Sequence, residues 1–367
     1  MFSTILISVC TFMHVYVFWR IASVPFIKHH VSGKVLIGSG IVLWAILVSS
    51  RVVWHSRSGI IAEIFELLGM NWLAVLFLIF LPLLITDILT LWGTLFPSLA
   101  SSLRGWALFI GLLLSLVATV QGLRPPTVEN HDVVLAGLPD NLDGTVIIAL
   151  SDMHLGSLIG KKWQEKRMAQ VRAQQPDLVV LLGDIFEGHS PDETAFAESF
   201  KKLSPPYGLW AVPGNHEFYA GNIMTHLESE NFRVLTNKWV EIKPGLILAG
   251  VEDLTVAGWI YPQKDPIALS LAGRPPGATI LLSHSPLQME NAARNGVGLM
   301  LSGHTHAGQI WPFGYLVKLR YPIIEGLHHI NGMNLIVGRG TGTWGPRMRL
   351  WKTGQILRIT LKSPEKR

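Results

Sequence analysis

Cysteine is nearly absent from this sequence. Cys10 is the single cysteine in 367 residues, and it lies in an apolar run near the amino terminus. One thiol excludes a disulfide framework within the chain and a zinc cluster built on cysteines. A single cysteine does not distinguish an oxidising from a reducing compartment.

A strong excess of one charge sign is absent as well. The formal net charge of +5 comes from six basic and three acidic residues in positions 1–122, and from 24 basic and 22 acidic residues in the remainder. Proteins that bind nucleic acid through their surface charge are usually far more basic. We expect no nucleic-acid partner.

Charge of either sign is scarce in the first third of the chain. Positions 1–122 hold nine of the 55 charged side chains, although 49% of the whole sequence is hydrophobic. Four apolar stretches approach the length a helix needs to cross a bilayer, at about 3–24, 35–50, 71–93 and 105–121. Tryptophans cluster near their ends, which is typical of an aromatic belt at the lipid headgroups. The sequence predicts a four-helix transmembrane domain over residues 1–124, with the bilayer as its partner.

Two features of this half have competing interpretations. The run 59–69 alternates apolar residues with Glu63 and Glu66, which predicts either an interfacial amphipathic helix or a short connecting helix packed on its neighbours. Asp87 lies well inside the third predicted span, and an intramembrane acid is often functional. A transporter normally needs several such groups, so we expect Asp87 to bond a neighbouring helix or to reach the headgroups.

The orientation in the membrane rests on a small difference. An even number of spans puts both ends of the chain on one side, and basic residues favour the cytoplasmic side. Three basic residues, Arg51, Arg57 and Arg124, lie on the side of the C-terminal domain. Four lie on the opposite side, namely Arg20, Lys28, Lys34 and Arg104. It favours a plasma (inner) membrane protein whose C-terminal domain lies outside the cytoplasm.

The pattern changes after Arg124, where two prolines end the fourth helix. Residues 125–143 are expected to be a linker and domain entry, and residues 144–367 the second domain. Six short apolar runs there predict buried strands, at 144–152, 177–184, 208–215, 246–253, 278–285 and 297–304. The charged segment 161–175 has the length of a crossover helix, so the domain is expected to be a layered α/β fold.

Five of these six runs end on side chains that can bind metal. They are Asp152 with His154, Asp184, Asn215 with His216, His284, and His304 with His306. A lone strand-end aspartate is usually a helix cap and a lone histidine is usually unremarkable, but strand ends meet at one edge of a sheet. Together these groups predict a metal centre. Nitrogen and oxygen donors favour manganese, iron or zinc, and the number of donors favours two ions about 3.5–4 Å apart that share a carboxylate.

The blocks DMH, GDIFEG, GNHE, SHSP and GHTHAGQI occur in this order within residues 144–345. In this respect the sequence resembles the calcineurin-like metallophosphoesterase superfamily, and especially its transmembrane and membrane-associated branch. The resemblance implies a layered β-sandwich flanked by helices and a metal-dependent phosphoesterase. Glu187 and Ala307 depart from the pattern of many relatives, and neither is expected to be a ligand. We expect Glu217 to be a supporting or capping acid.

The resemblance also implies a role for each residue of the motifs. Asp152, His154 and His306 would hold a first divalent ion, and Asn215, His284 and His304 a second. Asp184 would bridge the two ions, and His216 would lie over the substrate phosphate. A hydroxide held between the ions would attack phosphorus.

The substrate is less readable. Residues 309–327 and 256–262 are apolar and aromatic, which predicts either the last strands or a hydrophobic lip that admits a lipid-bearing phosphoester. Arg339, Arg347 and Arg349 are expected to bind phosphate oxygens, with structural salt bridges as the alternative.

We expect an integral-membrane, dinuclear-metal phosphohydrolase that cleaves a phosphodiester or pyrophosphate bond of a lipid or lipid-linked substrate. Two alternatives remain. One is a membrane-anchored phosphoesterase of soluble nucleotides or cell-envelope phosphoesters, and the other is a non-catalytic membrane receptor on the same fold.

Overall fold

The structure is a computed structural model that describes residues 2–54, 59–187, 193–219, 233–260 and 262–364. The chain divides into two compact units. One comprises Met1–Leu123 with Gly345–Trp351, and the other Arg124–Trp344 with Lys352–Arg367. We call them the membrane unit and the α/β unit.

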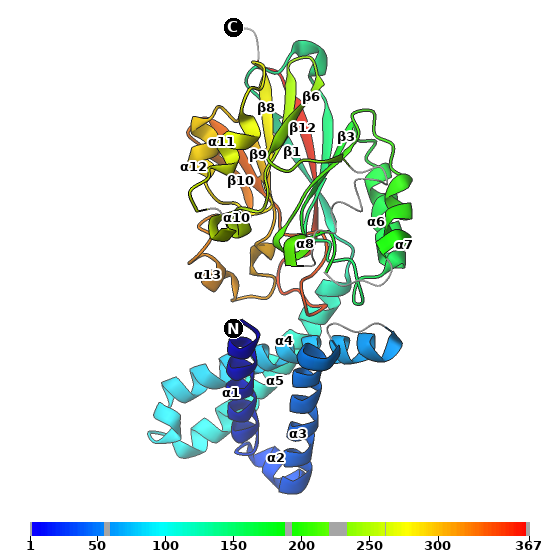
Figure 1. The fold of residues 1–367 in the computed structure, drawn as a ribbon. Helices are drawn as coiled ribbons and strands as arrows, with labels where there is room; N and C mark the ends of the chain where they lie inside the picture. Colours follow the sequence, from blue (N-terminus) through cyan, green and yellow to red (C-terminus); the bar gives the residue numbers. More distant parts are fainter. Residues whose placement is uncertain (1, 55–58, 188–192, 220–232, 261, 365–367) are drawn as a thin grey trace. The chain divides into compact units, whose positions relative to one another are not determined.

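The membrane unit is helical, as the apolar stretches predict. Four of its helical segments are long and apolar enough to cross a bilayer. Its helices are α1 (Phe2–Ile21), α2 (Pro25–His30), α3 (Gly33–Ser49) with a π-helical turn at Ser50–Trp54, α4 (Ile60–Leu89), the short η2 (Leu91–Gly93) and α5 (Pro97–Leu123) (Figure 1). The four apolar helices predicted for this part of the chain are confirmed.

The separate helix expected at 59–69 was wrong in both of its interpretations. Residues 60–69 are the first turns of α4, which continues without a break to Leu89. Gly69 lies where the chain passes Ser50, and a Cβ at this position would stand 2.2 Å from the Ser50 hydroxyl. The glycine therefore serves a close approach between segments rather than a helix end.

Asp87 bonds neighbouring helices, which confirms one of the two outcomes expected for it. Its side chain is fully buried, 2.5 Å from Nε of Arg20 on α1 and 2.7 Å from Nη2 of Arg104 on α5. The Tyr16 hydroxyl donates a third contact at 2.6 Å. Because α1, α4 and α5 all meet at this carboxylate, it ties three helices together.

A segment distant in sequence completes the membrane unit. Residues 345–351 belong to the region expected as the second domain, yet they pack on α4 and α5. The backbone nitrogen of Arg347 donates to the Asn71 side chain at 2.9 Å, and that of Arg349 donates to the Ala118 carbonyl at 2.9 Å. The Gln121 side chain accepts from the nitrogen of Trp351 at 2.7 Å.

The α/β unit contains two six-stranded sheets. The first has the order β1-β12-β2-β3-β4-β5, and the second β10-β11-β9-β8-β7-β6. The first sheet consists of β1 (Thr127–Val134), β2 (Val146–Leu150), β3 (Leu178–Leu182), β4 (Leu209–Val212), β5 (Arg233–Val234) and β12 (Gln355–Lys362). The second consists of β6 (Lys238–Lys243), β7 (Leu246–Gly250), β8 (Ala278–Leu282), β9 (Leu299–Ser302), β10 (Gly326–Ile330) and β11 (Met333–Val337).

All six predicted strands are present, as β2, β3, β4, β7, β8 and β9. The strands β2, β3 and β4 are parallel neighbours, and so are β7, β8 and β9. Their carboxyl ends therefore lie at the same edge of each sheet. Residues 125–143, expected to be a linker and domain entry, contain β1, whose eight residues pair in parallel with β12.

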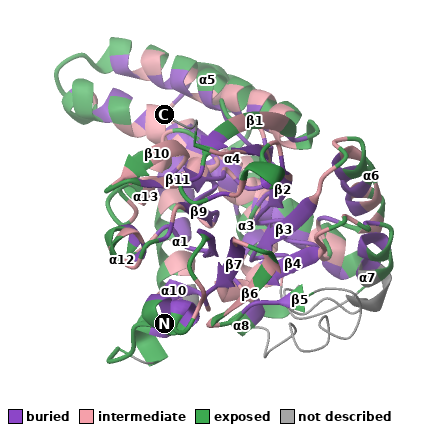
Figure 2. Cartoon of the chain, turned by 90° about the horizontal axis from the view of Figure 1, so that it is seen from above, coloured by how far each residue is buried: buried purple, intermediate pink, exposed green. Residues whose placement is uncertain are grey.

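The two sheets pack face to face, with helices on their outer sides (Figures 1 and 2). Alternate residues of the strands, such as Leu178 and Val180 on β3 and Leu246 and Leu248 on β7, form the core between the sheets. The helices are α6 (Lys161–Arg172) and α7 (Glu193–Lys201) on the first sheet, and α11 (Pro266–Leu271) and α12 (Met289–Arg294) on the second. Short segments complete the unit, namely η3 (Asp140–Leu142), α8 (Asn215–Tyr219), α10 (Leu254–Ile260), η4 (His306–Gly308) and α13 (Gly314–Val317).

We predict that Asp87→Asn destabilises the membrane unit. It would leave the Arg20 and Arg104 guanidiniums without their buried counter-charge, at a cost of about 3–5 kcal/mol. Thermal unfolding of the full-length protein in detergent measures this. Glu63→Gln, on the same helix and half-buried, is the matched control and is expected to change stability by less than about 0.5 kcal/mol. Equal melting temperatures for the two variants would contradict the role assigned to Asp87.

Candidate metal centre

The predicted ligands gather because each follows a buried strand of the α/β unit. Asp152 comes two residues after β2, Asp184 two after β3, His284 two after β8 and His304 two after β9. Asn215 opens α8, three residues after β4. The loops that follow these strands bring the side chains to one place, as the strand-end pattern predicts.

The backbone at this place is strained. Five of the predicted ligands have left-handed φ angles between 47° and 70°, namely Asp152, His154, Asp184, His304 and His306. This conformation costs a non-glycine residue of order 1–3 kcal/mol and clusters at functional sites. Gly183 allows the chains to meet, since a Cβ there would lie 2.7 Å from both Nδ1 of His284 and the Gly214 nitrogen. The fold therefore tolerates strained φ angles at these residues, because those angles direct the side chains to one place.

A first group of donors consists of Asp152, His154 and His306, all buried. The Nε2 atoms of His154 and His306 are 3.1 Å apart, and Nε2 of His306 lies 3.4 Å from the Asp152 carboxylate. On the other side of the His154 ring, Nδ1 is 2.5 Å from the Glu187 carboxylate. Glu187 thereby holds the ring so that Nε2 points into the group.

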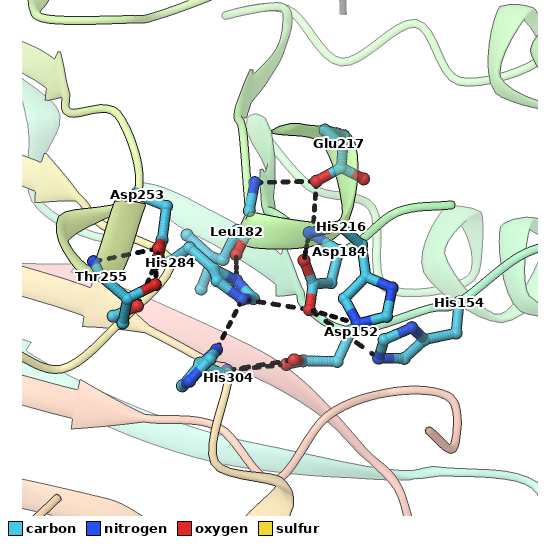
Figure 3. A network of polar contacts seen from close by, with 12 residues as sticks. Asp152, His154, Leu182, Asp184, His216, Glu217, Asp253, Thr255, His284 and His304 are labelled. Atoms are coloured by element: carbon cyan, nitrogen blue, oxygen red, sulfur yellow. Dashed lines mark hydrogen bonds and ion pairs between the residues drawn. The ribbon is translucent and has the colours of Figure 1, made fainter. Parts of the chain in front are cut away.

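A second group consists of Asp184, His284 and His304. Nε2 of His284 lies 3.2 Å from the Asp184 carboxylate and 3.0 Å from Nδ1 of His304. The opposite nitrogen of His284, Nδ1, is bound to the Leu182 carbonyl at 2.7 Å. Figure 3 shows the Asp184 carboxylate between His284 on one side and His154 and His216 on the other. Asp184 is thus placed between the two groups.

Asn215 and His216 complete the cluster. The Oδ1 atom of Asn215 is buried and has no hydrogen-bond partner among the residues that the structure describes. A buried amide oxygen of this kind is costly unless a hydrogen-bond donor or a cation binds it. The His216 ring is partly exposed, and its Nε2 lies 4.0 Å from Asp184. His216 can therefore reach a molecule that approaches the cluster from solvent.

Glu217 is the supporting acid that the sequence predicts. It is buried, and its carboxylate accepts backbone N–H groups from Asp184, Ile185, Phe186 and Gly214 at 2.7–3.1 Å. These bonds fix the loop after β3 and tie it to the loop after β4. Glu217 thus holds Asp184 in place through the backbone.

The charges in the cluster are strongly coupled. Burial disfavours ionisation of Asp184, but His284 and His216 outweigh it and hold the pKa of that carboxyl well below its ordinary value. Burial also opposes charge on His154, yet Glu187 and Asp184 raise its pKa to about 9. The pKa of His284 is likewise raised well above its usual value, by Asp184 against burial. In the ion-free protein, protons on these imidazoles carry the positive charge that the carboxylates require.

The donor set fits divalent ions. Two carboxylates, one amide oxygen and several imidazoles are the oxygen and nitrogen ligands that manganese, iron and zinc share. The imidazole nitrogens face one another at about 3 Å, in positions where a cation could replace the protons between them. The structure therefore brings together all seven predicted ligands and His216, and the assignment of these residues to particular ions stays a prediction.

The three predicted substrate arginines differ in their surroundings. Arg339 forms ion pairs with Glu129 at 3.0 Å and with Glu325 at 3.7 Å. Arg347 and Arg349 belong to the segment that packs in the membrane unit, and Arg349 is buried there. Their binding to a substrate stays a prediction.

Sequence reasoning missed two residues beside the cluster. Asp253 is buried after β7 and accepts from the hydroxyls of Ser285 and Thr255. It follows a strand as the other acids do, so the strand-end pattern could have found it. Tyr321 lies 2.8 Å from Nε2 of His304 through its hydroxyl. It follows no strand, and no motif marks it.

Comparisons with known proteins agree with this geometry. Residues 145–308 match the family model of the calcineurin-like phosphoesterases. A Danio rerio protein called "transmembrane protein with metallophosphoesterase domain" is 30% identical over 270 residues, which are 70% of this chain and 62% of that protein. The chain thus spans slightly less than two thirds of that relative.

Two bacterial proteins are matched over more of their length. An uncharacterized metallophosphoesterase of Helicobacter pylori is 32% identical over 276 residues, 72% of this chain and 73% of that protein. One of Aquifex aeolicus is 32% identical over 240 residues, 64% of this chain and 91% of that protein.

We predict that Mn²⁺ binds more tightly as the pH rises towards about 9. Below the raised pKa values of His154 and His284, each ion must displace protons from the ligands. Each displaced proton makes the apparent affinity rise about tenfold per pH unit, and the part of this dependence that comes from His154 flattens above its pKa of about 9. Calorimetry in buffers of different ionisation enthalpy counts the released protons.

The matched control is Glu198→Gln, which removes an exposed carboxylate on α7 that pairs with Lys161. It is expected to leave the pH slope unchanged. Binding without proton release and without pH dependence would refute the assignment of these imidazoles as ligands.

Proposed function

Because the chain belongs to the calcineurin-like phosphoesterase family, we propose that it is a metal-dependent hydrolase of a phosphodiester or pyrophosphate bond. The observation that carries the proposal is the position of Asp184. Its carboxylate lies 3.2 Å from His284 on one side and 4.0 Å from His154 on the other, between two groups of donors. A carboxylate shared in this way is the central ligand of a two-metal site.

In this proposal the two groups hold two divalent ions, of manganese, iron or zinc. Asp152, His154 and His306 bind the first ion, and Asn215, His284 and His304 bind the second, with Asp184 common to both. When bound, such a pair supplies Lewis acids for the phosphoryl oxygens and a nucleophilic hydroxide at neutral pH. The two groups of donors stay in fixed positions, because their side chains lie on loops that directly follow buried strands.

The role of His216 follows from its position. Its backbone nitrogen donates to Asp184 at 2.9 Å, which places the residue, while its ring stays partly open to solvent. A substrate phosphate at the cluster would meet this ring. His216 can stabilise the charge that develops on the phosphoryl group or donate a proton to the leaving oxygen. Its Nδ1 lies 3.7 Å from the Glu187 carboxylate, on the side of the first group of donors.

The substrate that we favour carries a lipid. Residues 309–327 are not last strands of a sheet, because they contain α13 and only the first residues of β10. Several large apolar side chains of this segment are exposed, and Leu319 is 84% exposed. Trp259 on α10, in the second apolar run, is also 84% exposed. Exposed apolar groups in two segments support a surface for acyl chains.

This apolar segment is bound to the metal centre. Tyr321 contacts His304, and the Thr305 hydroxyl donates to the Ile324 carbonyl at 2.6 Å. A lipid tail that rests on the segment would therefore place its phosphate close to the donors. We propose a lipid or lipid-linked phosphoester as substrate. We further propose that the protein resides in the plasma (inner) membrane with this unit outside the cytoplasm, on the basis of the basic-residue count in its loops.

We predict that Asp184→Asn abolishes hydrolysis of a generic aryl phosphodiester by the full-length protein in detergent with Mn²⁺. Loss of the shared charge should remove several kcal/mol of transition-state stabilisation, a fall of about 1,000-fold or more in kcat/KM. Asp132→Asn, an exposed acid on β1, is the matched control and should retain activity. Unchanged turnover by a folded Asp184→Asn protein would overturn the proposed function.

A second prediction concerns the lipid. In mixed micelles, acylated phosphoesters should be turned over in preference to water-soluble analogues with the same headgroup. Leu319→Ser should reduce that preference about tenfold or more, since a leucine that becomes buried under an acyl chain contributes about 1.5–3 kcal/mol. Leu269→Ser, an exposed leucine on α11, should keep it. Indifference of the parent protein to acyl chains would favour a soluble nucleotide or cell-envelope phosphoester instead.

A further inference from the structure

Three imidazoles of the cluster have the same pattern of contacts at their two ring nitrogens. Each has one ring nitrogen inside the cluster and the other bound to a group outside it. The outer partners are the Glu187 carboxylate for His154, the Leu182 carbonyl for His284 and the Tyr321 hydroxyl for His304. Outer partners of this kind orient a ligand ring and select its tautomer. The first two come from segments that follow or belong to β3, whereas Tyr321 comes from outside the motifs.

Tyr321 is well placed for such a role. It lies between α13 and β10, and its ring is half-buried against His304, with centroids 5.0 Å apart and planes at 67°. Its backbone nitrogen donates to the Val317 carbonyl at 2.9 Å, which anchors it to the end of α13. Three residues further on, the Ile324 carbonyl accepts the Thr305 hydroxyl. The segment is thus attached to both His304 and the residue after it.

We propose that Tyr321 is a positioning residue of the metal centre, whose hydroxyl holds Nε2 of His304 and directs Nδ1 towards the second group of donors. This inference rests on the proposed function. A neutral imidazole that binds a cation through Nδ1 carries its proton on Nε2. The Tyr321 oxygen, 2.8 Å away, accepts that proton in a hydrogen bond.

The chemistry of the outer partners makes the two halves unequal. Glu187 is an anion and increases the donor strength of His154, whereas Tyr321 is a neutral hydroxyl. A hydroxyl acts on the ring through one hydrogen bond of 2.8 Å and brings no counter-charge. The second half of the site would therefore depend more on ring orientation than the first half.

The test measures Mn²⁺ binding to the full-length Tyr321→Phe protein in detergent. Calorimetry gives the affinities, and electron paramagnetic resonance reports whether the bound ions form a pair. Phenylalanine keeps the ring and removes only the hydroxyl. We expect one of the two ions to bind about 10- to 100-fold more weakly, while the affinity for the other stays within about twofold. The spectrum of an exchange-coupled Mn²⁺ pair should give way to that of a single ion at limiting metal.

The matched control is Tyr207→Phe, a half-buried tyrosine just before the amino end of β4, which should bind both ions as the parent does. Unfolding curves of the ion-free variants check that each is folded. A Tyr321→Phe protein whose two affinities are unchanged, or fall equally, overturns this assignment alone. A parent protein that takes up no second ion overturns the proposed function together with it.

Discussion

The carboxylate of Asp184 is buried among imidazoles, and a charge in such surroundings is tolerated only with partner charges at close range. Much of the α/β unit serves this requirement. Glu217 collects four backbone N–H groups around the loop that carries Asp184, and Gly183 lets the loop pass beside His284. The left-handed backbone at Asp152, His154 and His304 persists because the surrounding contacts determine it.

The sequence predicts those parts of the molecule that depend on short-range patterns. The six buried strands are brief apolar runs, and their ends carry the donors, so both could be recognised. The strand β1 could not, because TVENHDVV has four consecutive polar residues at its centre and its partner β12 lies more than 200 residues away. The start of α4 was misread because Gly59 and Gly69 look like helix boundaries, while Gly69 in fact accommodates Ser50.

Contacts that depend on the tertiary fold stayed hidden for the same reason. Tyr321 reaches His304 from an apolar segment whose composition suggests a surface for lipid and nothing about metal. The structure attaches this apolar segment to His304 and Thr305, through the Tyr321 hydroxyl and the Ile324 carbonyl. Under the proposed function, an acyl chain on this segment would couple substrate occupancy to the orientation of the His304 ring.

The return of residues 345–351 to the membrane helices has a topological consequence. The polypeptide passes between the two units three times, near positions 123, 344 and 351, so a single cut after α5 does not separate them. A fragment that begins at β1 would keep residues 345–351 but lose the helices on which they pack. The backbone nitrogens of Arg347 and Arg349 would then lack their acceptors on α4 and α5. One proteolytic cleavage after α5 would therefore release the α/β unit together with residues 345–351, which would then lack their partners in the membrane unit.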